Sequence, residues 1–145
     1  MKHILLFLIL VLFAGTATGQ DSLRIISKWK LISYDAFEKV KTSPGYMLST
    51  EEERQLVDKT SKLLLDSVQY EFKQDGLLVY KDLENLAIVE RTAYWMLKGD
   101  ILFINELKRP YSRQAKIIEL SEHKLIITPI INGQVGDSKM IFTKM

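Results

Sequence analysis

The sequence of 145 residues contains no cysteine, which excludes disulfides, thiolate nucleophiles and cysteine-based metal sites. Histidine is scarce too: of the two present, only His123 lies beyond the N-terminal segment, in a polar turn that favours a solvated side chain. One histidine without cysteine makes neither the usual zinc site nor a catalytic triad. We therefore expect no metal, no cofactor and no catalytic residue.

An excess of charge of one sign is also lacking. The formal net charge is +2, and acidic and basic residues are mixed along the chain. A nucleic-acid-binding protein usually carries a basic patch or stripe, so we expect no nucleic-acid partner.

No apolar run approaches the roughly 20 residues that span a bilayer as a helix. The longest, Ile4–Phe13, follows a basic start and precedes a stretch of small residues, which is the order of a secretory signal. Ala17 and Gly19 supply the small side chains that favour cleavage after Gly19. We expect residues 1–19 to be a signal peptide and residues 20–145 one domain, the alternative being an uncleaved membrane anchor.

The predicted cut site has no cysteine after it to receive a lipid. The mature chain is therefore expected in the periplasm or outside the cell, as an exported protein that is not a lipoprotein and has no membrane span after signal cleavage.

One amphipathic helix is predicted, at about Thr50–Asp66. Ser49 and Thr50 are each followed three positions later by glutamate, as in a capping box, and acids crowd the first turn. Its apolar face includes Leu56, Leu63 and Leu64. We expect this helix to lie across an end of the domain with the leucines directed inward, as a fixed plug or a mobile lid.

The rest of the chain alternates between apolar and polar residues, as strands with one buried face do. Eight strands are predicted: 25–34, 68–73, 77–81, 87–97, 101–105, 114–120, 124–130 and 138–144. Short connections after the helix make sequential strands antiparallel neighbours, and eight strands suffice to close a barrel. We expect a mostly β, eight-stranded antiparallel up-and-down barrel with the helix between its first two strands; a two-sheet sandwich fits the same alternation.

Four segments spread along the chain resemble the bacterial lipocalin-like domains of exported Bacteroidota proteins: Ser27–Ser33, Tyr70–Gly76, Ala93–Leu102 and Ile118–Leu125. The resemblance implies a barrel with room for a cavity, but no particular ligand. It also implies that the Trp29 indole closes one barrel end, with a basic residue of the last strand across it. Lys144 is the candidate for that structural pair.

Inward-facing positions are the candidates for a cavity lining: Tyr70, Phe72, Val89, Arg91, Trp95, Leu102 and Ile118. An arginine inside a barrel needs an anionic partner or a ligand carboxylate or phosphate. The alternative is an alternation shifted by one residue, which places Arg91 in water and Tyr94 and Met96 inside. The basic segment Lys108–Arg113 is expected to be a solvated loop, the alternative being contact with anionic lipid headgroups.

These expectations favour a non-enzymatic binder or carrier of a small hydrophobic or lipid-like ligand. The alternative is a filled barrel that acts as a structural or protein-interaction module of the cell envelope, with an unknown protein partner. Catalysis ranks third, because scattered carboxylates and tyrosines are its only support.

Overall fold

A computed structural model describes residues 17–145 of the chain. Most of the predicted signal peptide therefore lies outside the described residues. The predicted cleavage point, Gly19, falls in the first described element, helix α2 (Ala17–Ile25), and stays a prediction.

Eight antiparallel strands form the barrel, and their bounds are β1 Lys28–Tyr34, β2 Gln69–Phe72, β3 Leu77–Glu84, β4 Ala87–Lys98, β5 Ile101–Glu106, β6 Ser112–Leu120, β7 Lys124–Ile131 and β9 Met140–Lys144. Consecutive strands pair from β1 to β7, and β9 joins β7 to β1. The pairing of β6 with β7 closes the ring, which confirms the predicted barrel and excludes the alternative of a two-sheet sandwich. The two-residue strand β8 (Gln134–Val135) only extends β7 at its edge.

The predicted turn between β2 and β3 is present at Asp75–Gly76. Gly76 has φ +84°, a left-handed conformation that a residue with a Cβ adopts at a cost. The Asp75 side chain accepts a hydrogen bond from the Leu77 N–H, which fixes the start of β3. This turn sets the register that pairs Tyr70 with Tyr80 and Phe72 with Leu78.

Three helices between β1 and β2 form a projection that we call the helical arm: α3 (Asp35–Lys41), α4 (Pro44–Met47) and α5 (Glu51–Ser67). The predicted helix is confirmed as α5, and Thr50 with Glu53 makes its capping box. Only one helix was predicted from the sequence, so α3 and α4 were not expected. Pro44 is at the start of α4, where its fixed φ suits a helix, and Ser43 caps it by accepting from the Tyr46 N–H.

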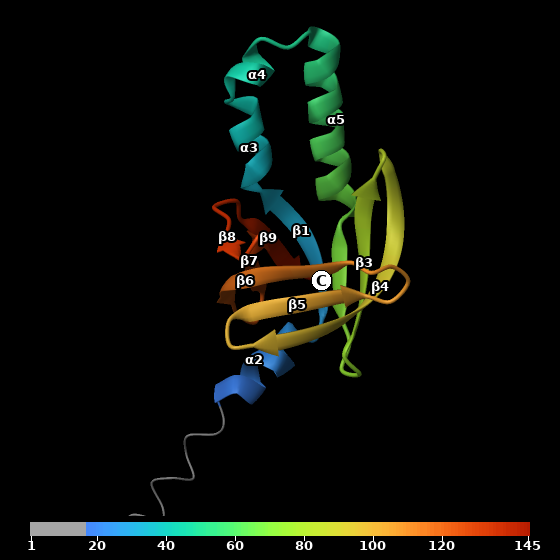
Figure 1. Ribbon diagram of the computed structural model, residues 1–145, viewed down its shortest axis with the longest axis vertical. Coiled ribbons are helices and arrows are strands. Elements are labelled where there is room, and N and C mark those ends of the chain that lie inside the picture. Colours follow the sequence, from blue (N-terminus) through green and yellow to red (C-terminus); the bar gives the residue numbers. More distant parts are fainter. Residues whose placement is uncertain (1–16) are drawn as a thin grey trace, which may run out of the picture.

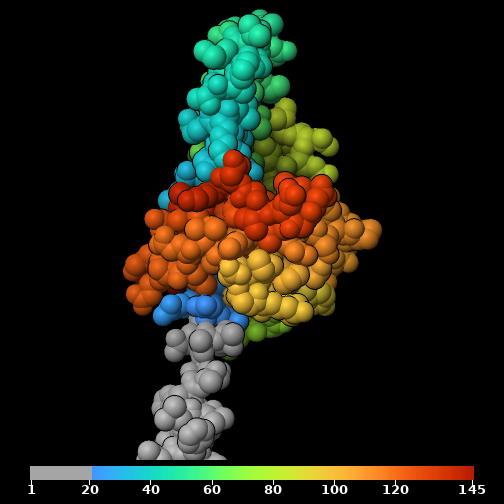
Figure 2. Space-filling model, turned by 60° about the vertical axis from the view of Figure 1, so that its left-hand side comes forward, coloured from blue at the N-terminus to red at the C-terminus, as the bar shows by residue number. Residues whose placement is uncertain are grey.

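The helical arm extends away from the barrel, and α2 lies at the opposite end (Figure 1; Figure 2). Leu64 and Leu65, in the last turns of α5, pack against the barrel core, and Leu63 is half-buried. Leu56 is 50% exposed, so the prediction that it points into the barrel is wrong. The cause is the attachment of α5: its C-terminus continues into β2, so the helix leaves the barrel end instead of crossing it.

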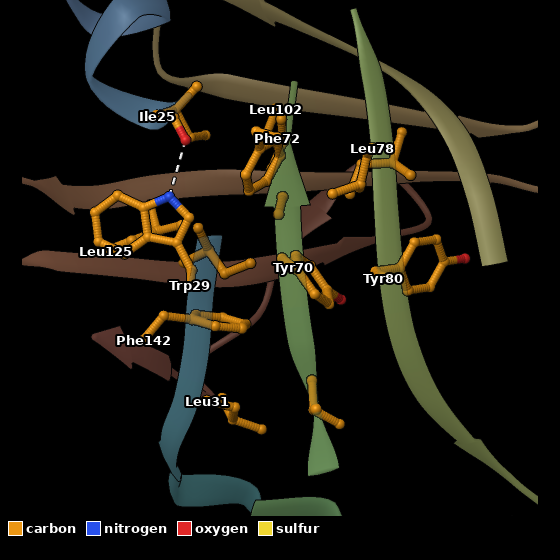
Figure 3. Close-up of a cluster of buried hydrophobic side chains, with 14 of the residues drawn as sticks. Ile25, Trp29, Leu31, Tyr70, Phe72, Leu78, Tyr80, Leu102, Leu125 and Phe142 are labelled. Atoms are coloured by element: carbon orange, nitrogen blue, oxygen red, sulfur yellow. Dashed lines mark hydrogen bonds between the residues drawn. The ribbon is translucent and has the colours of Figure 1, made fainter. Parts of the chain in front are cut away.

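The apolar core runs along the barrel from Ile25 of α2 to Leu31 near the base of the helical arm (Figure 3). Its largest fully buried side chains include Trp29, Phe72, Leu102, Leu125 and Phe142. The Trp29 Nε1–H donates a 2.8 Å hydrogen bond to the carbonyl oxygen of Ile25, which is itself fully buried. Ile25 is the last residue of α2, and β1 begins at Lys28. The prediction that Ile25 begins the first strand is therefore wrong.

Candidate functional site

The inner face of the barrel becomes polar at the end beside the helical arm. On β5 the inward side chains run from buried Leu102 and Ile104 to Glu106, whose side chain is 3% exposed. On β6, Arg113 and buried Ala115 share the inward face. We call this region the charged end; its ionic side chains are Asp82, Glu84, Arg91, Glu106, Arg109 and Arg113.

Arg113 is the cation of this group that lies on the inner face of β6. Its guanidinium lies over the Tyr80 ring, 4.9 Å from the centroid, and its Nη1 is 3.7 Å from the Asp82 carboxylate. Its Nε and Nη2 are shielded from solvent and form no hydrogen bond of normal geometry within residues 17–145, although the guanidinium interacts with the Tyr70 hydroxyl. Burial acts to lower the pKa of Arg113, but Tyr70, Tyr80 and Asp82 outweigh it and raise the pKa, so the guanidinium stays charged.

Glu106 joins two other groups of the charged end. It accepts a hydrogen bond from the Tyr80 hydroxyl and forms an ion pair with Arg109. Mainly because of the hydrogen bond from Arg109, the pKa of Glu106 falls to about 2. Burial, together with the bond to Glu106, raises the pKa of Tyr80, so its hydroxyl remains protonated.

Tyr70 lies next to Tyr80, with 5.4 Å between the ring centroids. Burial raises the pKa of Tyr70, and the positive charge of Arg113 opposes that rise. Both phenols are therefore neutral near pH 7, and each is able to donate a hydrogen bond.

Arg91 is on the inward face of β4, opposite Tyr80 in the register of β3 and β4. Ala93 on the same face is fully buried, whereas Tyr94 and Met96 on the other face are 55% and 45% exposed. The alternative alternation, shifted by one residue, is therefore excluded, and Arg91 faces the barrel interior. Arg91 forms an ion pair with Glu84, so its charge has a partner within the protein.

A cavity of about 50 Å³ lies beside Arg113, largely against the paired strands β6 and β7. Its lining is mostly apolar and comprises Tyr70, Ile104, Arg113, Gln114, Ala115, Ile127, Pro129 and Met140. A water occupies about 30 Å³ of liquid, and an apolar cavity of roughly 150 Å³ binds benzene. The cavity thus takes one small group or one end of a larger molecule.

The predicted lining residues are distributed over the barrel. Tyr70, Phe72 and Leu102 are buried in the core, while Val89 and Trp95 are partly exposed. Only Tyr70 among the seven candidates lines the apolar cavity.

The prediction that Ile118 faces inward is wrong, because its side chain is 44% exposed. A bulge between Ile117 and Glu119 breaks the alternation and leaves Ile117 packed on the core. Ile118 instead borders an open hollow of about 350 Å³ on the outside, shared with Asp21 of α2 and Asp100.

Trp29 and Lys144 are brought together as directly paired residues of β1 and β9. The Lys144 Nζ lies 5.3 Å from the centroid of the Trp29 ring. The pair is at the end of the barrel that α2 covers, away from the charged end.

Sequence reasoning missed Arg113, Glu106 and Tyr80 as members of the site. Arg113 had been assigned to the solvated loop, which is wrong because β6 begins at Ser112, earlier than expected. The signal was present: period-two alternation extended from Ala115 back to Arg113, and from Ile104 on to Glu106, places both charges inward.

Two findings limit other kinds of site. Residues 17–145 contain no group of three or more acidic or histidine side chains suited to holding a metal ion. Over the same residues, every helix is too short or too polar to cross a membrane.

Comparison with known proteins finds no matching family model and no matching curated protein sequence. Among solved structures, the chain is similar to a lipocalin-like protein from Bacteroides uniformis, with 19% identity, a TM-score of 0.52 and coverage of 84% of this chain and 99% of that one. It is also similar to an uncharacterized protein from Bacteroides eggerthii, with 16% identity, a TM-score of 0.50 and coverage of 83% and 98%. These similarities confirm the lipocalin-like fold.

Proposed function

We propose that the protein is an exported, non-enzymatic binder of a small, largely hydrophobic molecule, which it holds at the charged end of the barrel. The supporting observation is the mostly apolar cavity beside Arg113, bounded by Tyr70, Ile104, Ala115 and Ile127. Apolar pockets with a few converging polar groups are the usual form of small-molecule sites. Export rests on the signal-like order of the first 19 residues.

The depth of binding is limited by the core. Trp29, Phe72, Leu102 and Phe142 are 1% exposed or less and occupy the barrel toward α2. With a volume of only about 50 Å³, the site accepts one end of a ligand, and the remainder lies at the mouth. This geometry fits a narrow or chain-like molecule better than a bulky ring system.

Native mass spectrometry of protein purified from its own host tests the proposal. A bound small molecule is expected, and its signal should disappear from the variant Ala115→Leu, which adds three carbons at the 7% exposed cavity wall. The control is Ala87→Leu on the exposed start of β4. A parent protein with no small-molecule adduct, or an adduct kept by Ala115→Leu, would contradict the proposal.

A second candidate function is supported by the tip of the helical arm, where Met47 is 69% exposed and Leu48 88% exposed. Adjacent exposed apolar residues on a projecting element are typical of a protein-interaction site. Cross-linking in envelope extracts should then give a partner band that the double variant Met47→Ser, Leu48→Ser loses. Equal capture by both proteins would argue against this function.

A further inference from the structure

We propose that the molecule held at the charged end carries a carboxylate, which the free edge of the Arg113 guanidinium binds through two hydrogen bonds. This inference rests on the proposed function and names the chemistry of the inserted end. The residue that carries this inference, Arg113, was assigned to a solvated loop in the sequence analysis.

The first argument is the identity of the two unpartnered donors. Nε and Nη2 lie on the same edge of a guanidinium, with their N–H bonds nearly parallel. Both are shielded from solvent and neither forms a hydrogen bond of normal geometry within residues 17–145, so a ligand reaches them by displacing the side chains that cover them. Two parallel donors form the fork that a carboxylate accepts in a bidentate pair. A buried donor left without an acceptor costs roughly 1–3 kcal/mol, so a ligand that supplies two acceptors gains affinity here.

The second argument is that the guanidinium is held in place before a ligand arrives. The Tyr80 ring covers one face at 4.9 Å, and the Tyr111 ring lies 5.9 Å from the guanidinium. Tyr80 is itself fixed by its hydrogen bond to Glu106. The fork is therefore preorganised, which reduces the entropy lost on binding.

The third argument comes from charge. The other two arginines of the charged end already have close carboxylate partners, Glu84 for Arg91 and Glu106 for Arg109. Asp82, at 3.7 Å, is beyond hydrogen-bond distance of Arg113. Arg113 is thus the arginine of the cluster that has no carboxylate within hydrogen-bond distance.

The size and lining of the cavity select among anions. A planar carboxylate fits about 50 Å³ more readily than a phosphate ester, and the apolar walls at Ile127, Pro129 and Met140 suit an alkyl chain. A monocarboxylic acid with an aliphatic chain meets both requirements. A phosphate monoester would use the same fork and is the alternative that the experiment separates.

The test is isothermal titration of the full mature chain with three probes of equal chain length: octanoate, 1-octanol and octyl phosphate. Octanoate should bind at least about tenfold more tightly than 1-octanol, since bonds to charged groups contribute about 1.5–3 kcal/mol. Octanoate should also bind more tightly than octyl phosphate. A tighter octyl phosphate complex would overturn the carboxylate assignment.

Three variants assign the effect to Arg113. Arg113→Lys keeps the charge but removes the fork, and should weaken octanoate about tenfold while leaving 1-octanol unchanged. Asp82→Asn removes the competing carboxylate and should tighten octanoate binding. Lys116→Gln, an outward-facing cation on the same strand paired with Asp100, is the control and should bind as the parent does. Thermal melts of each variant establish that it is folded.

The outcomes separate this inference from the proposed function. Equal binding of octanoate and 1-octanol, unaffected by Arg113→Lys, would overturn the carboxylate while the hydrophobic site stands. No binding of any probe at millimolar concentration would overturn both, and would indicate that the Arg113 donors are satisfied by ordered water only. Tighter octanoate binding lost in Arg113→Lys and strengthened in Asp82→Asn would establish the site.

Discussion

The Tyr80 hydroxyl donates a hydrogen bond to the Glu106 carboxylate inside the charged end of the barrel, although 26 positions separate the two residues in the chain. The bond joins β3 to β5 across the intervening strand β4. It holds the ring on which the Arg113 guanidinium stacks. The geometry of the proposed ligand site therefore depends on Glu106 remaining ionised.

Acid should weaken the fold partly through Glu106. Its pKa is about 2 in the folded protein, below its ordinary 4.5, so ionised Glu106 stabilises the fold above about pH 4.5. That stabilisation is lost as the pH falls from 4.5 toward 2. In urea unfolding at pH 7 and pH 3, Glu106→Gln should lose less stability between the two than the parent does. The exposed control Glu119→Gln should follow the parent, and a Glu106→Gln loss as large as the parent's would contradict this account.

Two neighbouring glutamates of α5, Glu52 and Glu53, should differ in their contribution to stability, because only Glu53 belongs to the capping box. The Glu53 carboxylate accepts a hydrogen bond from the Thr50 N–H, and the Glu53 N–H donates to the Thr50 hydroxyl. Glu53→Ala and Thr50→Ala should each lower the free energy of unfolding by about 1 kcal/mol. Glu52→Ala, one position earlier in the same turn, should cost only a few tenths. Equal losses for Glu52→Ala and Glu53→Ala in urea titration would show that the box contributes nothing.

In the Trp29–Lys144 pair, the packing of the indole should contribute more to stability than the electrostatic contact with the lysine. Trp29 is fully buried and its indole donates to Ile25, so Trp29→Ala should cost about 3–5 kcal/mol. Lys144→Met removes only the cation above the ring and should cost about 0.5–1 kcal/mol. Lys124→Met, an exposed lysine on the adjacent β7, serves as control in the same denaturant titrations. A Lys144→Met variant as stable as this control would remove the cation–π contact from the account.

Leucines of α5 should differ in their contribution to stability according to their position along the helix. Leu64 packs on the barrel core, and its replacement by serine should cost at least about 1.5 kcal/mol. Leu56 is half exposed, and Leu56→Ser should stay within about 0.5 kcal/mol of the parent. Thermal melts followed by circular dichroism measure both. A larger loss for Leu56→Ser would show that the helical arm folds back onto the barrel.

The fold was largely predictable from local signals. Alternation in segments such as Gln69–Phe72, the Asp75–Gly76 turn and the acids after Thr50 each specify their element without help from distant residues. Strand count and short connections then made barrel closure the expected solution.

The charged end was not predictable to the same degree. The bulge at Ile117–Glu119 reverses the facing of Ile118, and no residue type in that segment signals it. The environment of Arg113 depends on Tyr80 and Asp82, which lie 30 or more positions earlier in the chain and meet it only after barrel closure. Contacts between residues so far apart in the chain depend on the register of every strand pair between them. The alternation of apolar and polar residues predicts each strand separately and does not predict these contacts.

The central claim, a ligand site at the charged end, is tested most directly by titrating uniformly ¹⁵N-labelled residues 20–145 with octanoate in two-dimensional NMR. The account predicts saturable shifts of the Arg113 Nε–H and of backbone amides around the cavity, such as Ala115 and Ile127, with the helical-arm tip at Met47 and Leu48 unchanged. Shifts confined to that tip, or no shift of the Arg113 Nε–H at saturating octanoate, would contradict it.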